Sequence, residues 1–553
     1  MLKRFVSYLG RSKSLDEPAP APSGDDDAAS RLHAAAEALR AGRLEEAEEL
    51  LEGLLKKHHD CAEAHLLLGD ANKARGLKDD ARDSYILAQC FKPTWSVPFE
   101  RLGMLAFDEG QCDEAIAALR QALSRGANNG TVHNTLGAAY YEKDRLDEAF
   151  HHLKAALALQ PDFPEAHSNI GLLLFRGLEQ FDEGASHLET ALRLKPDHAG
   201  ALCNWIMVLQ HRGRIEEALS LCNELLTRDP TLHEARLIRG LILLGKREFS
   251  PGWADYELRK AVRSNYQLRS LPWPEWSGSS LKGKTIYVHL EQGLGDEIMF
   301  ASCLPDIIAE ANKCICECSP KLHRLFRHSF PGAVIVGKEA WREPGFSALH
   351  APDHQTAIGS LPRFLRNSPQ DFPMHQGYLT ADPDRVTYWR TRLAALPGRT
   401  KIGISWRGGA KSTRGTLRSI PLHQWLPILT LPDCDFVSLQ YSECEEELAD
   451  VRRLGLRVEH WQEAIDDYSE TAALVTALDL VVSVQTAVVH LAGALGKPVW
   501  ALISAAAEWR YGCSGETMPW YPSARLTRQT TIGEWDSVIA RLQSALSVWT
   551  SAR

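Results

Sequence analysis

The pattern of apolar and polar positions changes once along the chain, near residue 270. Before this point, short acidic segments that end on a small residue recur, as in "GRLEEA", "GLKDDA", "GQCDEA" and "GRIEEA". After it, short runs rich in β-branched residues alternate with stretches of helical pattern. The first pattern predicts an array of helices, and the second predicts strands that alternate with helices.

The repeated segments are regularly spaced. Their last residues follow one another at intervals of 34 residues, with one interval of 35: Ala47, Ala81, Ala115, Ala149, Gly184, Ala218 and Gly252. A glycine stands 12 residues before several of these positions, and a proline stands 12 residues after four of them. In the fifth repeat Gly171 lies one residue further back, because "RGLEQ" carries an inserted residue. Each repeat is therefore predicted to be two helices that cross closely at small residues.

This pattern resembles the tetratricopeptide repeat (TPR) over residues 29–262. Ala35 and Ile206 occupy the glycine position in two repeats, so we expect those helix pairs to pack more widely. Such arrays curve into a superhelix whose concave groove binds a peptide or protein segment. The alternative is an array that only forms oligomers or supports the second half. Residues 1–28, rich in Pro, Ala and Asp, are predicted to be a disordered leader.

The second half is predicted to form two parallel α/β sheets. The expected strands are "TIYVHL", "CICEC" and "AVIVG" in one sheet, then "KIGISW", "DFVSLQ", "LVVSV" and "PVWALI" in the other. We expect a linker at 263–281, one α/β domain at 282–380 and a second at 381–553, with a hinge in "TADPDRVTYWRTRLAALPGRT". In such folds ligands bind at the carboxyl ends of the strands, so the loops that follow strands are the candidate sites.

Composition excludes several classes of protein. The chain has 553 residues, 44% of them hydrophobic, and a formal net charge of −9, which does not favour nucleic acid as a partner. No run approaches the apolar length of a membrane span, and "MLKRFVSYLG" has too short an apolar core for a secretory signal. We therefore expect a cytoplasmic protein without a membrane span.

Twelve cysteines are scattered along the chain, and we expect no disulfides. Cys314, Cys316 and Cys318 form one cluster, whose spacing of two places all three on one face of a strand. Zinc sites commonly use C-x₂₋₄-C spacing with a second pair elsewhere, and this second pair is missing from the sequence. Buried strand thiols are the favoured interpretation, and no metal is expected.

Two loops after strands have the residues of an anion site. "GISWRGGAKSTRGTLRSIPL" places Arg407, Lys411, Arg414 and Arg418 among glycines and hydroxyls, as a phosphate site requires, although a solvated basic loop has the same composition. In "LVVSVQTAVVHLAGALGKPVWALI", Thr486 is predicted to cap a helix that ends at Gly496. Thr486 and His490 would share one face at the positive end of that helix, where a phosphate binds; a structural histidine is the alternative.

A third such loop is "EQGLGDEIMF", residues 291–300. Gly293 and Gly295 follow a predicted strand, as in a dinucleotide fingerprint, but Ile298 stands in place of the third glycine. A nicotinamide or flavin enzyme is therefore disfavoured, and a P-loop motif is missing from the sequence. Our preferred interpretation is that the glycines bring the backbone close to a reacting group and that Asp296 removes a proton.

Together these motifs resemble the bacterial tetratricopeptide-repeat glycosyltransferases whose catalytic half is similar to lipopolysaccharide heptosyltransferases. The resemblance covers residues 272–545, through "EQGLGDEIMFASCLP", "ISWRGG", "RSIPL", "FVSLQ", "ETAALVTALDLVVSVQTAVVHLAGALGKPVW" and "PWYPSARLTRQ". It implies the GT-B fold of two facing Rossmann-like domains and a nucleotide-activated sugar in the C-terminal domain. It also implies inversion at the anomeric carbon and no metal or other cofactor.

The resemblance assigns the general base to Asp296. His289 and Glu297 are our reserve candidates for the base. A helix N-terminal acid that interacts with the dipole is the alternative for Asp296. We expect Arg407, Lys411 and the helix end at Thr486 to stabilise the departing phosphate. Gln440, at the end of "FVSLQ", is expected to contact the nucleotide or the sugar.

One position departs from the family, which usually has Ser-Val-Asp-Thr where this chain has Ser483, Val484, Gln485 and Thr486. A neutral amide there can still bind a sugar, and it would favour a donor that carries its own carboxylate, such as a nonulosonic acid. Hexosyl and heptosyl donors stay open, and so does a catalytically dead descendant.

The expected function is transfer of a sugar to Ser or Thr of a protein held by the repeat groove, with flagellin as one acceptor. Two alternatives remain. The first is transfer to a lipid or polysaccharide intermediate, and the second is a noncatalytic scaffold that senses a nucleotide sugar.

Overall fold

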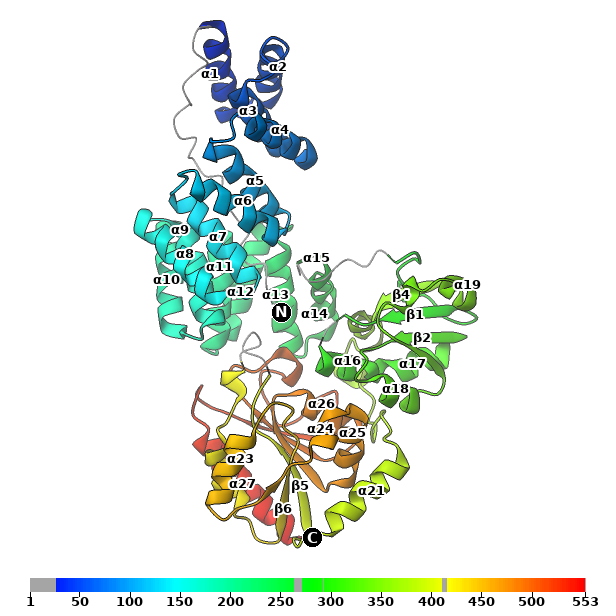
Figure 1. The fold of residues 1–553 in the computed structure, drawn as a ribbon. Coiled ribbons are helices and arrows are strands. Elements are labelled where there is room, and N and C mark those ends of the chain that lie inside the picture. Colours follow the sequence, from blue (N-terminus) through cyan, green and yellow to red (C-terminus); the bar gives the residue numbers. More distant parts are fainter. Residues whose placement is uncertain (1–25, 263–270, 292, 410–414, 553) are drawn as a thin grey trace. The chain divides into compact units, whose positions relative to one another are not determined.

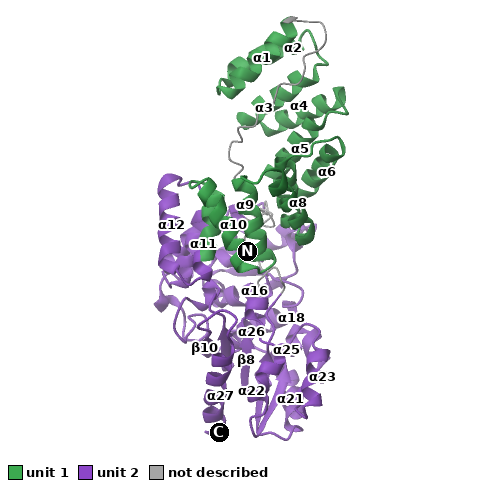
Figure 2. Ribbon diagram, turned by 90° about the vertical axis from the view of Figure 1, so that its left-hand side faces the viewer, with its two compact units in different colours: residues 1–208 green, residues 209–553 purple. Residues whose placement is uncertain are grey.

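The computed structural model describes residues 26–262, 271–291, 293–409 and 415–552. A helical-repeat solenoid comes first and an α/β region built on parallel sheets follows, as predicted (Figure 1). Contacts divide the chain into two compact units, residues 1–208 and 209–553 (Figure 2).

The first unit consists of antiparallel helix pairs. Its helices are α1 (Asp26–Arg40), α2 (Leu44–Leu55), α3 (Ala62–Ala74), α4 (Lys78–Phe91), α5 (Ser96–Asp108), α6 (Cys112–Ser124), α7 (Gly130–Glu142), α8 (Leu146–Leu159), α9 (Pro164–Leu172), η1 (Leu173–Gly177), α10 (Phe181–Leu194) and α11 (Ala199–His211), whose last residues extend into the second unit. In three of the pairs, α4, α8 and α10 each end two residues before a proline at the predicted position: Pro93, Pro161 and Pro196.

Small residues lie where paired helices touch. A Cβ added to Gly69 would meet the ring of Tyr85 at 2.4 Å, and one added to Gly137 would meet Leu153 at 2.6 Å. Ala35 and Ile206, which replace the glycine, are fully buried. The residue inserted in the fifth repeat is accommodated in the π-helical turn η1, which explains the single interval of 35.

The second unit begins with the last helices of the array: α12 (Ile215–Arg228), α13 (His233–Gly245), α14 (Phe249–Tyr256) and α15 (Arg259–Val262). α14 is bound into the core of this unit through Trp253. The Trp253 indole donates a 2.8 Å hydrogen bond to the carbonyl of Arg366, and its ring lies 5.6 Å from that of Trp509. The last helices of the array therefore do not form a separate domain from the α/β region, because the two share one hydrophobic core.

Two parallel sheets complete the second unit. One has the order β3-β2-β1-β4 and the other β10-β9-β8-β5-β6-β7. Their strands are β1 (Thr285–His289), β2 (Lys313–Glu317), β3 (Ala333–Val336), β4 (His354–Ala357), β5 (Thr400–Ser405), β6 (Cys434–Ser438), β7 (Val458–Glu459), β8 (Leu480–Val484), β9 (Val499–Ile503) and β10 (Ala524–Arg528). All seven predicted strands are present. Sequence did not indicate β4, β7 and β10, which are short or rich in polar residues.

Helices connect these strands. They are α16 (Leu294–Phe300), α17 (Leu304–Glu310), α18 (His323–Ser329), α19 (Phe346–His350), α20 (Pro362–Leu365), α21 (Pro383–Ala394), α22 (Leu426–Leu429), α23 (Glu445–Arg453), α24 (Gln462–Asp466), α25 (Tyr468–Ala477), α26 (Ala487–Ala494) and α27 (Asp536–Ser551). The predicted hinge segment contains α21. Within the described ranges, every helix is too short or too polar to cross a lipid bilayer.

The cysteine cluster is buried, as predicted. Cys314 and Cys316 lie on β2 and Cys318 follows it, each at most 1% exposed. Burial raises the pKa of Cys314 and of Cys318 to about 12. These thiols are therefore neutral core residues at physiological pH.

Candidate functional site

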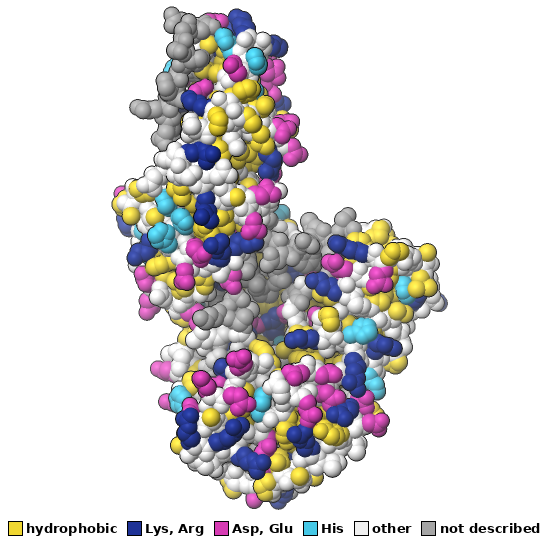
Figure 3. Space-filling view, viewed as in Figure 1, with side chains coloured by type: hydrophobic (Ala, Val, Ile, Leu, Met, Phe, Trp, Pro, Cys, Tyr) yellow, Lys and Arg dark blue, Asp and Glu magenta, His cyan; other side chains and the backbone are white. Residues whose placement is uncertain are grey.

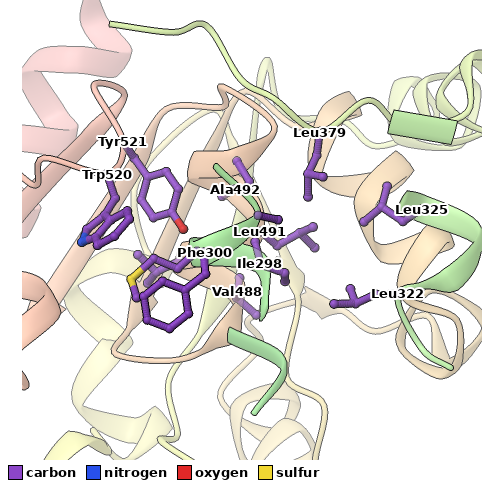
Figure 4. Packing of buried hydrophobic residues seen from close by; sticks show 14 of the residues in the cluster. Ile298, Phe300, Leu322, Leu325, Leu379, Val488, Leu491, Ala492, Trp520 and Tyr521 are labelled. Atoms are coloured by element: carbon purple, nitrogen blue, oxygen red, sulfur yellow. The ribbon is translucent and has the colours of Figure 1, made fainter. Parts of the chain in front are cut away.

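The N-termini of α16 and α26 meet. α16 follows β1 and α26 follows β8, so the two helices start at the carboxyl ends of central strands in the two sheets. Figure 4 shows Ile298 of α16 beside Val488 and Leu491 of α26. A Cβ added to Gly295 would lie 3.2 Å from Cδ2 of His490 and 3.5 Å from Cα of Ala487. Gly295 therefore permits the close approach of these two helices.

Gly293 differs from Gly295. It is the N-cap residue of α16, and a Cβ added there would meet no atom of another described residue within 4 Å. The predicted role of both glycines in bringing backbone near a ligand stays a prediction. Only Gly293 faces open space.

Asp296, in the first turn of α16, forms an ion pair with Arg510 of the turn η9 (Trp509–Tyr511). Arg510 also pairs with Glu508, and the Glu508 carboxylate lies 3.2 Å from Nη1 of Arg418. Arg418 in turn donates a 3.0 Å hydrogen bond to the carbonyl of Gln485, just before α26. A network of ion pairs and one hydrogen bond thus connects the first turn of α16 with the loops that follow β5, β8 and β9 of the larger sheet.

Arg510 is the cation that sequence reasoning missed. Its side chain is only 10% exposed. Burial lowers the pKa of its guanidinium, but the charge of Asp296 and the nearby Tyr511 and Tyr256 outweigh this and raise the pKa. The sequence could have indicated Arg510, because it lies in the loop after the predicted strand β9, and arginines in such loops are candidate anion ligands.

Thr486 caps α26 as predicted, since its side chain accepts a hydrogen bond from the backbone N–H of Val488 at 3.2 Å. His490 lies one turn further along, and both of its ring nitrogens face protein groups. Nδ1 is 3.1 Å from the hydroxyl of Tyr521, and Nε2 is 3.4 Å from that of Tyr511. Burial, and then the charge of Arg510, lower the pKa of His490 to about 3. The imidazole is therefore neutral and supplies no positive charge to a phosphate.

The side chain of Gln485 is buried beside Thr486. Its Oε1 accepts a 2.9 Å hydrogen bond from the backbone N–H of Ser504. Its Nε2 has no hydrogen-bond partner among the described residues. Both N–H donors of the amide therefore stay available for a ligand oxygen at the start of α26.

Gln440 and Arg407 hold the loop after β5. Oε1 of Gln440 accepts hydrogen bonds from the backbone N–H groups of Trp406 and Arg407, at 3.2 and 3.0 Å, and Nε2 donates to Ser442 at 3.0 Å. Arg407 pairs with Glu447 at 3.2 Å. The predicted donor contacts of these two residues stay predictions, and both side chains already have protein partners. Lys411 and Arg414 lie outside the described residues.

Glu297 and His289 are the reserve candidates for the base. Burial raises the pKa of Glu297 to about 7, and the negative charges of Glu317 and Asp296 raise it further. The backbone N–H of Ser319, which donates a 2.9 Å hydrogen bond to Oε2 of Glu297, acts in the opposite direction. His289, at the end of β1, is 6% exposed, and its Nδ1 is 3.4 Å from the carbonyl oxygen of Leu290. Glu297 therefore titrates near neutral pH, but its carboxylate is directed to the loop after β2.

A second missed residue, Arg259 on α15, holds the loop that leads to Gly293. Arg259 is fully buried, and its Nε and Nη2 donate to the carboxylate of Glu291 at 3.0 and 3.1 Å. Its Nη2 also donates to the hydroxyl of Ser360 at 2.8 Å. Nothing in the repeat pattern distinguishes this arginine, because its partners come from the α/β region.

The fold and the site define a helical-repeat protein fused to an α/β unit of two parallel sheets. Comparison with known families agrees: residues 137–177 match the TPR repeat, and residues 32–91 and 172–233 match the Tetratricopeptide repeat. The repeat prediction is confirmed.

Protein FlbA of Caulobacter vibrioides is 32% identical over 542 residues, which are 94% of this chain and 90% of that protein. The chain belongs to the family of this protein.

Solved structures resemble parts of the chain. The TPR protein YrrB, described as having an unusual peptide-binding site, is 22% identical, with a TM-score of 0.27, over 31% of this chain and 88% of its own. PilF of Pseudomonas aeruginosa is 16% identical, with a TM-score of 0.35, over 39% of this chain and 97% of its own.

Proposed function

We propose that the protein is an inverting, metal-independent glycosyltransferase of the cytoplasm. It moves a sugar from a nucleotide-activated donor to Ser or Thr hydroxyls of a protein bound by the repeat array. The observation that carries this proposal is the meeting of Asp296 with the Arg510–Glu508–Arg418 network at the start of α26. The GT-B-like motifs of the sequence and the two parallel sheets support it.

The site contains the carboxylates of Asp296 and Glu508 and two guanidinium groups. A base and cations are the parts that such a transfer needs. The acceptor hydroxyl attacks the anomeric carbon and gives its proton to Asp296. The bond from that carbon to the phosphate oxygen breaks, and the nucleotide leaves with the electron pair. Arg510, Arg418 and the N-terminus of α26 stabilise the negative charge that develops on the leaving phosphate.

The ion pair of Asp296 requires one further step. Oδ1 of Asp296 is occupied by the guanidinium of Arg510. The donor phosphate offers Arg510 another anionic partner, so donor binding would release Asp296 to accept the proton. Donor binding thus precedes activation of the acceptor.

The repeats support a protein acceptor, because tetratricopeptide arrays bind polypeptide segments in their concave groove. Flagellin is the acceptor to test first. The decisive experiment is intact mass spectrometry of flagellin and other surface proteins from cells that carry the wild-type protein or Asp296→Ala. The proposal is supported if a surface protein loses a glycan mass in the Asp296→Ala strain while the Asp296→Ala protein itself is folded. It is contradicted if the masses of the surface proteins are the same in the two strains.

A noncatalytic scaffold is the second candidate. Two observations favour it: Asp296 is held by Arg510, and Gln485 stands where the resembled family has an acid. A scaffold would keep its cellular function in the Asp296→Ala strain, whereas a transferase would lose it.

A further inference from the structure

A pocket of about 350 Å³ shares no lining residue with the network of Asp296 and Arg510. Three segments form it: α18, the start of the segment that leads into α21, and the first turn of α25. Its polar lining includes His323, Arg324, Arg327, His328, Asp382 and Ser469. This volume is within the range of small-molecule sites.

Basic side chains dominate one wall of the pocket. Arg324 is engaged, since it lies 3.4 Å from Asp382, 3.6 Å from Asp467 and 3.9 Å from Glu470. Arg327 and His328 are different. Both are exposed, and neither side chain has a hydrogen bond or ion pair with another described residue.

The acids around the pocket already have partners within the protein. Asp382 caps α21 by accepting from the backbone N–H of Asp384 at 3.0 Å. Glu470 is held by Arg385 at 2.8 Å and by the indole of Trp389 at 3.0 Å. Each of these carboxylates lies within 4 Å of Arg324 or Arg385. Arg327 and the two histidines have no ion pair with any described residue, so they are the groups that can meet a ligand.

The opposite wall contributes a hydroxyl. Ser469, in the first turn of α25, is 6% exposed, and its Oγ has no hydrogen-bond partner among the described residues. Its backbone N–H donates a 2.7 Å hydrogen bond to Oδ1 of Asp467. A buried hydroxyl without a hydrogen bond lowers the stability of the fold unless a ligand or a water molecule supplies the hydrogen bond.

From this geometry we infer that the pocket binds the phosphate of a small phosphomonoester, such as a sugar phosphate. A phosphomonoester has up to two negative charges and three acceptor oxygens, so it can engage Arg327, the imidazoles and a hydroxyl together. A carboxylate, with one charge and two oxygens, uses fewer of these groups. The inference does not depend on the proposed transferase activity, because the pocket shares no residue with Asp296 or its network.

The test is equilibrium binding to the full-length protein by isothermal titration calorimetry, with glucose 6-phosphate as the probe. The wild-type protein should bind glucose 6-phosphate and inorganic phosphate but not glucose. Arg327→Gln should weaken binding roughly tenfold, the effect of losing one charged hydrogen bond, and Ser469→Ala should weaken it severalfold. Arg390→Gln is the matched control, because Arg390 is exposed on α21 and does not line the pocket.

Several results would overturn the inference. They are absence of binding to the wild-type protein, equal binding of glucose, or equal affinities of Arg327→Gln and Arg390→Gln. Binding that is lost in Arg418→Gln but kept in Arg327→Gln would place the phosphate at α26 instead. A phosphoserine peptide that binds far more tightly than glucose 6-phosphate would show that the natural ligand is not a small molecule. Thermal unfolding of each variant confirms that it is folded.

Discussion

The carboxylate of Asp296 and the guanidinium of Arg510 form an ion pair although 214 residues separate them in the sequence. The pair joins the first turn of α16, after the smaller sheet's β1, to a loop of the larger sheet. It therefore couples the candidate base to the candidate phosphate ligand.

Asp296→Asn should separate binding from chemistry. The amide cannot accept the proton, so we expect transfer to fall by about 10²–10⁴-fold. Arg510 loses its competing carboxylate, so affinity for the donor nucleotide should stay equal or increase. Initial rates and equilibrium nucleotide binding on the same purified protein measure the two effects. Weaker nucleotide binding would argue against the competition between Asp296 and the donor phosphate.

Gly295→Val tests the contact between α16 and α26. The added side chain would press against the ring of His490, which two tyrosines hold in place, so the free energy of unfolding should fall by about 1–3 kcal/mol. Gly337→Val is the control, because a Cβ there meets no atom within 4 Å in the part of the chain that the structure describes. Urea unfolding measures both variants. A loss of similar size in the two would show that the helix contact is not the cause.

Arg259→Gln should destabilise the second unit strongly. It leaves the carboxylates of Glu291 and Glu257 without their buried cation, which costs about 3–5 kcal/mol. Lys284→Gln breaks an exposed pair with Asp353 and should cost less than about 1 kcal/mol. Chemical denaturation followed by tryptophan fluorescence distinguishes the two. Equal losses would contradict the structural role of Arg259.

The neutral His490 predicts a pH dependence of stability. An imidazole in the unfolded chain titrates near 6.5, whereas the pKa of His490 in the folded protein is lowered to about 3. Between these values the unfolded chain binds a proton that the folded protein does not, so the free energy of unfolding rises with pH in this window. His490→Gln should flatten that rise. Urea unfolding at several pH values measures the slope, and an unchanged slope would show that His490 does not titrate as proposed.

Sequence predicted the helical array because its signal is local and repeated. In several pairs the helices meet at a glycine and a large residue sixteen positions apart, such as Gly69 and Tyr85, and this arrangement recurs at the 34-residue interval. The inserted residue was also visible in sequence, but only the structure shows that it becomes the π-helical turn η1.

The strands at the centres of the sheets were predictable for a similar reason. β1, β8 and β9 are buried along their whole length, so they are mainly apolar. β4 and β10 lie at sheet edges and contain polar residues, and β7 has only two residues. Their strand conformation depends on pairing with a neighbour, which no local pattern reports.

The sequence by itself determined the repeat array, the central strands, the cap at Thr486 and the loops in which chemistry was to be sought. Tertiary structure alone decided how those loops are paired. It joined Asp296 to Arg510, Arg259 to Glu291, and His490 to Tyr511 and Tyr521. The physical reason is that burial and charge pairing depend on distances in space. These partners come from separate elements, and no short-range periodicity encodes their contact.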